Sequence, residues 1–80
     1  MLVIRPSEAP GFVEIPVPCY CDSTKIQIIH VCYSSISHFS NDNITYSAGN
    51  ESIHCRLNMT SKEICRVMVK ALKNLENATD

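Results

Sequence analysis

The sequence has no tryptophan, only two glycines and no apolar run near the roughly 20 residues needed to cross a bilayer. It also lacks the catalytic motifs G-x-S-x-G and H-E-x-x-H and a glycine-rich phosphate loop. A chain of 80 residues rarely builds a water-excluding pocket around a pair such as Cys65 with His30 or His54. We therefore predict that the protein is not an enzyme and uses no cofactor.

The cellular compartment is indicated by N-glycosylation sequons and not by a leader. The apolar run Met1–Ile4 is shorter than the roughly 7 to 15 residues of a signal-peptide core, so we expect no leader and interpret Met1 as an expression start. The pattern Asn-x-Ser/Thr occurs four times within the last 38 residues, at Asn43, Asn50, Asn58 and Asn77. Accidental matches on a polar surface are the alternative. We predict a secreted, extracellular glycoprotein.

Five cysteines in so short a chain are typical of secreted scaffolds, in which disulfides compensate for a thin core. They stand at Cys19, Cys21, Cys32, Cys55 and Cys65. Neighbours one residue apart in an extended segment point to opposite sides, so Cys19 and Cys21 are expected to join two separate elements, with Cys32 and Cys55 as acceptors. Cys65 is then unpaired or intermolecular, although the sequence alone does not determine the pairing.

A mixed thiolate and imidazole metal site is the alternative use of these residues, but their C-x-C and H-x-C spacing is not that of zinc half-sites. The ligand set considered is Cys19, Cys21, His30, Cys32, His54 and Cys55. We predict no metal site. His54 is expected to face solvent and His38 to lie in a loop.

Residues 1–18 carry all four prolines and are expected to form a flexible arm before one domain over residues 19–80. The alternation of Phe12, Val13, Ile15 and Val17 is broken by proline, so a central strand is excluded, whereas an edge strand or a segment lying over the core remains open.

Residues 25–34 are rich in β-branched residues with apolar groups on both faces, which predicts a central strand. Residues 43–47 and 52–58 alternate around a turn at 48–51 and predict a hairpin with Ile44 and Tyr46 inward. This register places Asn43 and Asn58 on solvent faces and Asn50 in the turn.

A C-terminal helix is predicted from the capping box Thr60–Glu63 and from a stripe of apolar residues at helical spacing. The stripe consists of Ile64, Val67, Met68, Ala71, Leu72 and Leu75. The predicted fold is a small disulfide-rich α+β domain, in which a three-stranded antiparallel sheet is followed by this amphipathic helix.

The opposite side of the helix collects basic residues, namely Lys62, Arg66, Lys70 and Lys73. A solvated face is the simple interpretation, and an anionic polysaccharide such as glycosaminoglycan is the functional one. Residues 1–51 hold two basic and five acidic groups, whereas residues 52–80 hold five basic and three acidic. Nucleic acid is not expected as a partner, because basic and aromatic residues do not interleave.

The C-x-C pair Cys19–Cys21, the three strands and the basic helix resemble the chemokines over residues 17–78, and Glu51–Ile64 looks like that family's third strand, its cysteine and the loop into the helix. The resemblance implies pairing of Cys19 with Cys32 and of Cys21 with Cys55. It also implies receptor contacts before Cys19, at Phe12, Val13, Ile15 and Val17, and glycosaminoglycan contacts on the helix.

We therefore expect a secreted ligand or immune modulator, of cytokine type, that binds a cell-surface receptor or another extracellular protein. The alternatives are a small disulfide-rich inhibitor of a protease or signalling protein, which presents a loop or strand edge, and a disulfide-linked subunit of a secreted complex. A dimer through Cys65 or through a strand edge is possible under each.

Overall fold

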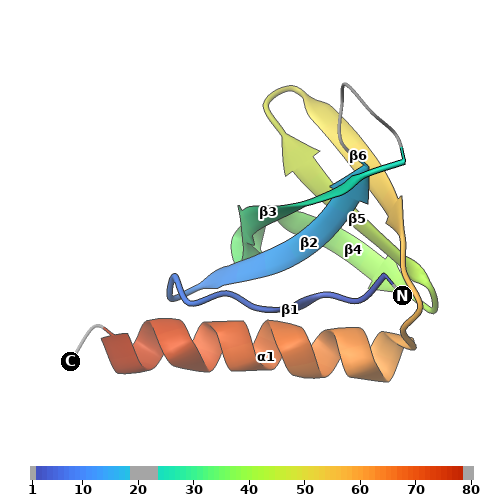
Figure 1. Ribbon diagram of the computed structural model, residues 1–80. Helices are drawn as coiled ribbons and strands as arrows, with labels where there is room; N and C mark the ends of the chain where they lie inside the picture. Colours follow the sequence, from blue (N-terminus) through green and yellow to red (C-terminus); the bar gives the residue numbers. More distant parts are fainter. Residues whose placement is uncertain (1, 19–23, 79–80) are drawn as a thin grey trace.

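The chain folds as two antiparallel sheets that stand on a C-terminal helix in the computed structural model, which describes residues 2–18 and 24–78 (Figure 1). In chain order the elements are β1 (Arg5–Pro6), β2 (Phe12–Pro18), β3 (Ile26–Cys32), the 3-10 helix η1 (Tyr33–Ser35), β4 (Ile36–Ser40), β5 (Asn43–Ala48), β6 (Glu51–Arg56) and α1 (Ser61–Ala78).

Sheet A has the lateral order β1-β2-β3 and sheet B the order β4-β5-β6. All pairings within both sheets are antiparallel. The predicted α+β class and the C-terminal helix are confirmed. The expectation of one three-stranded sheet is corrected, because the described residues form two.

Residues 5–6 and 12–18 belong to sheet A, which differs from the flexible arm expected over residues 1–18. β2 is the central strand of this sheet, so the exclusion of a central strand on account of its prolines was wrong. β2 pairs with β1 on one side and along its whole length with β3 on the other. Ile4, Val13 and Ile15 are buried in the core. This segment therefore contributes apolar side chains that the rest of the small chain needs for a core.

Pro16 and Pro18 fit into β2 because their missing amide groups would point away from β3. The Phe12 carbonyl accepts a hydrogen bond from the Ser7 amide at 3.0 Å, so even-numbered residues of β2 direct their backbone polar groups toward the β1 side. β1 pairs with β2 only as far as Glu14. The prolines lie beyond that point and remove no hydrogen bond from the ladder.

β3 is confirmed as a strand, but it lies at the edge of sheet A and not at its centre. Ile29 and Val31 pack against the core, as expected for one face. Ile26 and Ile28 on the other face are 50% and 53% exposed. Apolar residues on both faces had predicted that both faces of this strand are covered. In the structure one face is covered and the other is open to solvent.

The predicted hairpin is confirmed as β5 and β6, which pair from Asn43–Arg56 to Ala48–Glu51. Gly49, in the two-residue loop, has a φ of +64°, which glycine adopts without a side-chain clash. The second strand ends at Arg56 and not at residue 58.

β4 lies where a loop was expected and includes His38. It pairs with β5 across the tight turn at Asn41 and Asp42, and its register shifts between Ile36 and His38. Because this strand is short, irregular and rich in serine, alternation did not reveal it.

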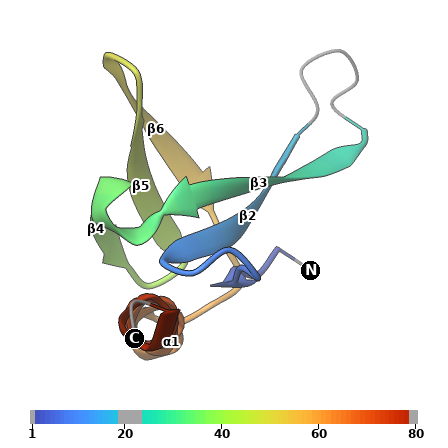
Figure 2. The ribbon, with the colours of Figure 1, turned by 90° about the vertical axis from the view of Figure 1, so that its left-hand side faces the viewer.

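The core lies between the two sheets and the helix. Its buried apolar side chains come from both sheets, from the segments before β1 and α1, and from α1: Ile4, Val13, Ile15, Ile44, Tyr46, Leu57, Met59, Ile64 and Ala71. Figure 2 looks along the helix and shows the β2–β3 and β5–β6 hairpins diverging above it. The end of β2, the start of β3 and the turn between β5 and β6 therefore stand away from the shared core.

The capping box predicted at the start of α1 is confirmed. The Thr60 amide donates to Glu63 Oε1 at 3.0 Å, and the Glu63 amide donates to Thr60 Oγ1 at 3.3 Å. The Ser61 amide donates to Asn41 Oδ1 at 2.8 Å, which attaches the helix start to the β4–β5 turn. Ile64 and Ala71 of the predicted stripe are fully buried.

Candidate functional site

The outer face of sheet A presents exposed apolar side chains on an edge strand. Pro16 lies opposite Ile28, and Pro18 lies opposite Ile26, so these four residues share one face. Pro16 is buried, while Pro18, Ile26 and Ile28 are exposed. We call Pro18, Ile26 and Ile28 the bare face, because each is accessible and none belongs to a sequon.

Two hollows adjoin this face and share Leu2 and Pro16 as lining residues. The first, about 370 Å³, is bounded by Ile26 and Ile28. The second, about 550 Å³, lies between β2 and β6 and includes Cys55. Together they extend the surface of the bare face toward sheet B. A side chain of a partner could enter either hollow.

The residues proposed for receptor contact do not form one surface. Val13 and Ile15 are fully buried and belong to the core, so they cannot meet a partner while the protein is folded. Phe12 is 37% exposed, and Val17 is partly buried. Sequence reasoning missed Ile26 and Ile28 because their exposure depends on β3 lying at an edge.

All four sequon asparagines are exposed. Asn43 lies in β5, Asn50 in the loop between β5 and β6, Asn58 in the connection to the helix, and Asn77 near the end of α1. None lies in sheet A. Glycans at these positions would be attached to sheet B, to its connection to the helix and to the helix itself.

Cys32, Cys55 and Cys65 are free thiols in the structure, while Cys19 and Cys21 lie outside the described residues. The two predicted acceptors differ in position. Cys32 lies opposite Phe12, at the end of the β2–β3 pair that is far from Pro18. The Cys55 thiol donates to the Pro16 carbonyl at 3.7 Å. Pro16 lies near the C-terminal end of β2, which precedes Cys19 in the sequence.

The thiols of Cys32 and Cys55 also differ in acidity. A hydrogen bond with the Ser34 side chain lowers the pKa of Cys32 below its ordinary value of 9.0, with the Ser34 backbone adding to the effect. Burial raises the pKa of Cys55 above the same value and also raises the pKa of Tyr46. Cys32 therefore has the stronger tendency to form a thiolate.

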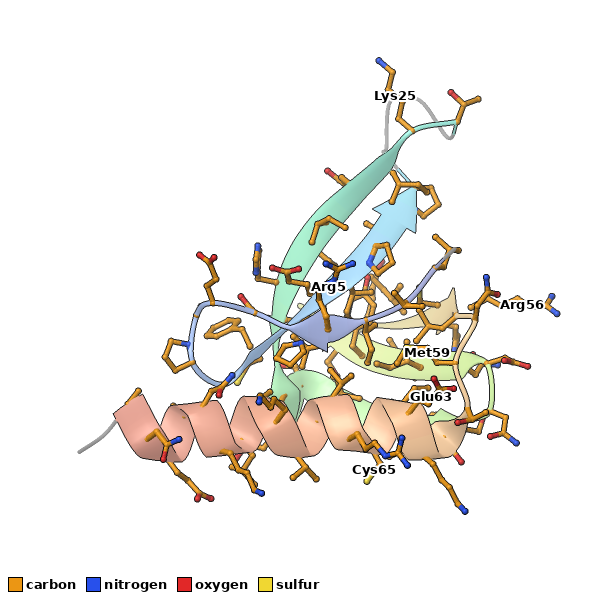
Figure 3. The ribbon with its side chains drawn as sticks, turned by 60° about the horizontal axis from the view of Figure 1, so that its bottom comes forward. Arg5, Lys25, Arg56, Met59, Glu63 and Cys65 are labelled. Carbon is orange, nitrogen blue, oxygen red and sulfur yellow. The ribbon has the colours of Figure 1, made fainter. Side chains whose placement is uncertain are left out.

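The basic residues predicted on the helix are all exposed: Lys62, Arg66, Lys70 and Lys73. Cys65 is exposed between them, and Figure 3 shows it on the side of α1 that faces away from the sheets. Val69 is 44% exposed on the same side. A shallow hollow of about 260 Å³ brings Cys65 and Val69 together with three of the basic side chains, those of Arg66, Lys70 and Lys73.

No three possible metal ligands of the His, Cys, Asp or Glu type gather within residues 2–18 and 24–78. Of the ligand set weighed from the sequence, His30 forms a hydrogen bond with Ser7 Oγ at 2.7 Å. His54 is exposed, as expected, and Thr45 Oγ1 lies 2.8 Å from its Nδ1 atom. Thr45 alternates with the inward Ile44 and Tyr46, yet it is only 3% exposed.

A scan against protein-family models and searches of curated proteins and of solved structures find no match to this chain. Within the described residues, no helix is both long and apolar enough to cross a membrane.

Proposed function

We propose that this protein is a small secreted glycoprotein that acts by binding another extracellular protein, and that the bare face is its contact surface. The observation that carries the proposal is the exposure of Ile26 and Ile28, at 50% and 53%, on an edge strand. The backbone groups of an edge strand are a template for a partner strand, and exposed apolar side chains on that strand add contact area for it.

The placement of the sequons supports the same surface. Three of the four acceptor asparagines lie on sheet B or on its connection to the helix, and the fourth is near the helix C-terminus. If these positions carry glycans, sheet A is the largest protein surface left for contact. This proposal rests on the surface and does not require the chemokine resemblance.

The test is binding of labelled, glycosylated protein to a panel of cells or candidate extracellular partners. Ile26→Asp with Ile28→Asp should reduce binding at least about tenfold, because the charges would have to be desolvated at the contact. Ser40→Asp with Ser47→Asp is the matched control, since both serines are exposed, lie in sheet B and belong to no sequon. Equal binding by both double variants would contradict the proposal.

Glycosaminoglycan is a second proposed partner, favoured by the four exposed basic side chains on α1. Reversal of Arg66, Lys70 and Lys73 to Glu should lower the salt concentration at which the protein leaves a heparin column. Lys25→Glu is the control, because Lys25 is exposed at the tip of sheet A, far from the helix (Figure 3). Unchanged retention of the triple variant would show that the basic side is only solvated.

We also propose that disulfides stabilise the secreted form, with Cys55 as one acceptor. Its thiol contacts the Pro16 carbonyl, three residues before Cys19 in the sequence. A disulfide map of cell-secreted protein should place Cys55 in a bridge to Cys19 or Cys21. A Cys55 that remains a free thiol in that map would contradict this pairing.

The competing proposals, an inhibitor or a covalent subunit, differ in which residues they need. An inhibitor that offers a strand edge would use β3, so the Ile26 and Ile28 variants should lose inhibition of the target. A covalent subunit would use the exposed Cys65, and a dimer on a non-reducing gel should disappear in Cys65→Ser.

A further inference from the structure

Two histidines converge on the outer face of sheet B. His38 of β4 and His54 of β6 each lie opposite Thr45 of the central strand β5. Because neighbouring strands lie about 4.8 Å apart, residues on β4 and β6 start roughly 10 Å apart at the backbone. Their ring centroids are only 6.5 Å apart. The two imidazoles therefore lean toward each other above Thr45.

Thr45 lies beneath this pair and orients one member of it. It is 3% exposed, although it is on the solvent side of the sheet, and its hydroxyl is 2.8 Å from His54 Nδ1. A hydrogen bond at Nδ1 leaves Nε2 as the remaining ligand atom of His54. Histidines that bind metals are commonly held in this way through their other ring nitrogen.

From this arrangement we propose that His38 and His54 bind a divalent transition-metal ion, with Zn²⁺ as the representative ion, and that Thr45 positions His54. A Zn–N bond is about 2.1 Å long, which places two imidazole centroids on one ion roughly 5 to 6 Å apart. The observed 6.5 Å is close to that separation. A small rotation of the exposed His38 side chain closes the difference.

The surroundings select the class of ion. The side chains that share this face are Ser40, Asn43, Ser47, Ser52 and Arg56, and they include no carboxylate. Ca²⁺ and Mg²⁺ prefer oxygen ligands and carboxylates, whereas imidazole suits Zn²⁺, Cu²⁺ and Ni²⁺. With two protein ligands the ion keeps open positions, which water fills in the isolated protein.

The experiment is a titration of the folded protein with Zn²⁺, followed through the imidazole NMR signals. The chain has three histidines, so His30 is an internal reference in every spectrum. The signals of His38 and His54 should change together along one binding curve, while that of His30 stays constant. This measurement also separates the site from zinc held by cysteine thiols.

Variants make the assignment specific. His38→Gln and His54→Gln should each weaken Zn²⁺ binding at least tenfold, and His30→Gln should not change it. Thr45→Val should weaken binding between about 10-fold and 100-fold. Because Thr45→Val also removes the Asn43 sequon, Asn43→Gln is its matched control and should bind as the wild type does.

The proposal is overturned if the signals of His38 and His54 do not move at millimolar Zn²⁺, or if all three histidines respond alike. It is also overturned if the glutamine variants at His38 and His54, shown by circular dichroism to be folded, bind Zn²⁺ as tightly as the wild type.

Discussion

Sheets A and B share one core, but their solvent-facing sides differ in chemical character. The outer face of sheet A carries the exposed apolar side chains of Ile26 and Ile28 beside His30, whereas that of sheet B carries His38, His54, Arg56 and small polar residues. The sequons of the strands follow the same division, since Asn43 and Asn50 belong to the β5–β6 hairpin and none lies in sheet A. Burial on the inner faces thus determines the fold, while the difference between the outer faces is the basis for the contact surface proposed on sheet A.

The largest expected effect concerns whether the two sheets form one cooperative unit. Ile15 of sheet A and Ile44 of sheet B are both fully buried in the common core. Ile15→Ala and Ile44→Ala should each lower the free energy of unfolding by about 2–5 kcal/mol, because each leaves a cavity. Urea unfolding measured by far-ultraviolet circular dichroism and by the near-ultraviolet signal of the tyrosines should give one midpoint in each variant. Separate midpoints would mean that the sheets unfold independently.

The two glycines allow a second comparison of the sheets, because Gly11 precedes β2 of sheet A and Gly49 lies in the turn between β5 and β6 of sheet B. Gly11 and Gly49 both have positive φ, +83° and +64°. An added Cβ at Gly11 would lie 3.2 Å from Leu75 of the helix, whereas one at Gly49 would meet nothing within 4 Å. Gly49→Ala should cost about 1 kcal/mol from the backbone alone, and Gly11→Ala should cost more. Thermal unfolding compares the pair, and equal losses would contradict the predicted contact with Leu75.

Loss of the cap of α1 should lower the free energy of unfolding by a smaller amount, and part of the contribution of the cap should depend on pH. Thr60→Ala should cost about 1 kcal/mol. Hydrogen bonds from the Thr60 backbone and side chain lower the pKa of Glu63 below its ordinary value of 4.5. The unfolded state therefore takes up the proton first, and the contribution of Glu63 is lost as the pH falls below 4.5 and through the lowered pKa.

Glu63→Gln is the matched control for this pH effect. Over that acid range, unfolding measurements should show the wild type losing more stability than Glu63→Gln. Parallel pH profiles for the two proteins would contradict a lowered pKa at Glu63.

The smallest effect is a difference in thiol reactivity between the sheets. In the reduced protein, iodoacetamide should modify Cys32 of sheet A at lower pH than Cys55 of sheet B, because their pKa values are shifted in opposite directions. Peptide mass spectrometry over a pH series measures both thiols at once. Ser34→Ala should move the Cys32 profile to higher pH. Identical pH profiles for the two thiols would contradict the opposite pKa shifts of Cys32 and Cys55.

The elements that could be predicted from sequence are those encoded by local patterns. The Thr60–Glu63 cap and the apolar stripe of α1 need only residues three or four apart, and the β5–β6 hairpin needs alternation around one turn. β4 was missed because its short, serine-rich sequence carries no such signal. β2 was not predicted as a central strand because its prolines appeared incompatible with pairing on both sides, although they face the side that β1 leaves unpaired.

The candidate sites were less predictable than the elements. The basic side of α1 follows from helical spacing, and its residues are exposed as expected. The bare face and the pairing of His38 with His54 could not be predicted, since each depends on which strands lie side by side. His38 and His54 are 16 positions apart in the sequence and meet only because β4 and β6 flank the same strand.

The sequence by itself determined the helix, its cap and the hairpin, because those features arise from periods of two and 3.6 residues and from a capping motif within one segment. Only the tertiary structure decided that the proline-rich segment joins the core, that β3 is an edge strand and that two histidines converge. These features depend on lateral strand order, which the burial of a shared core selects from many locally equivalent pairings.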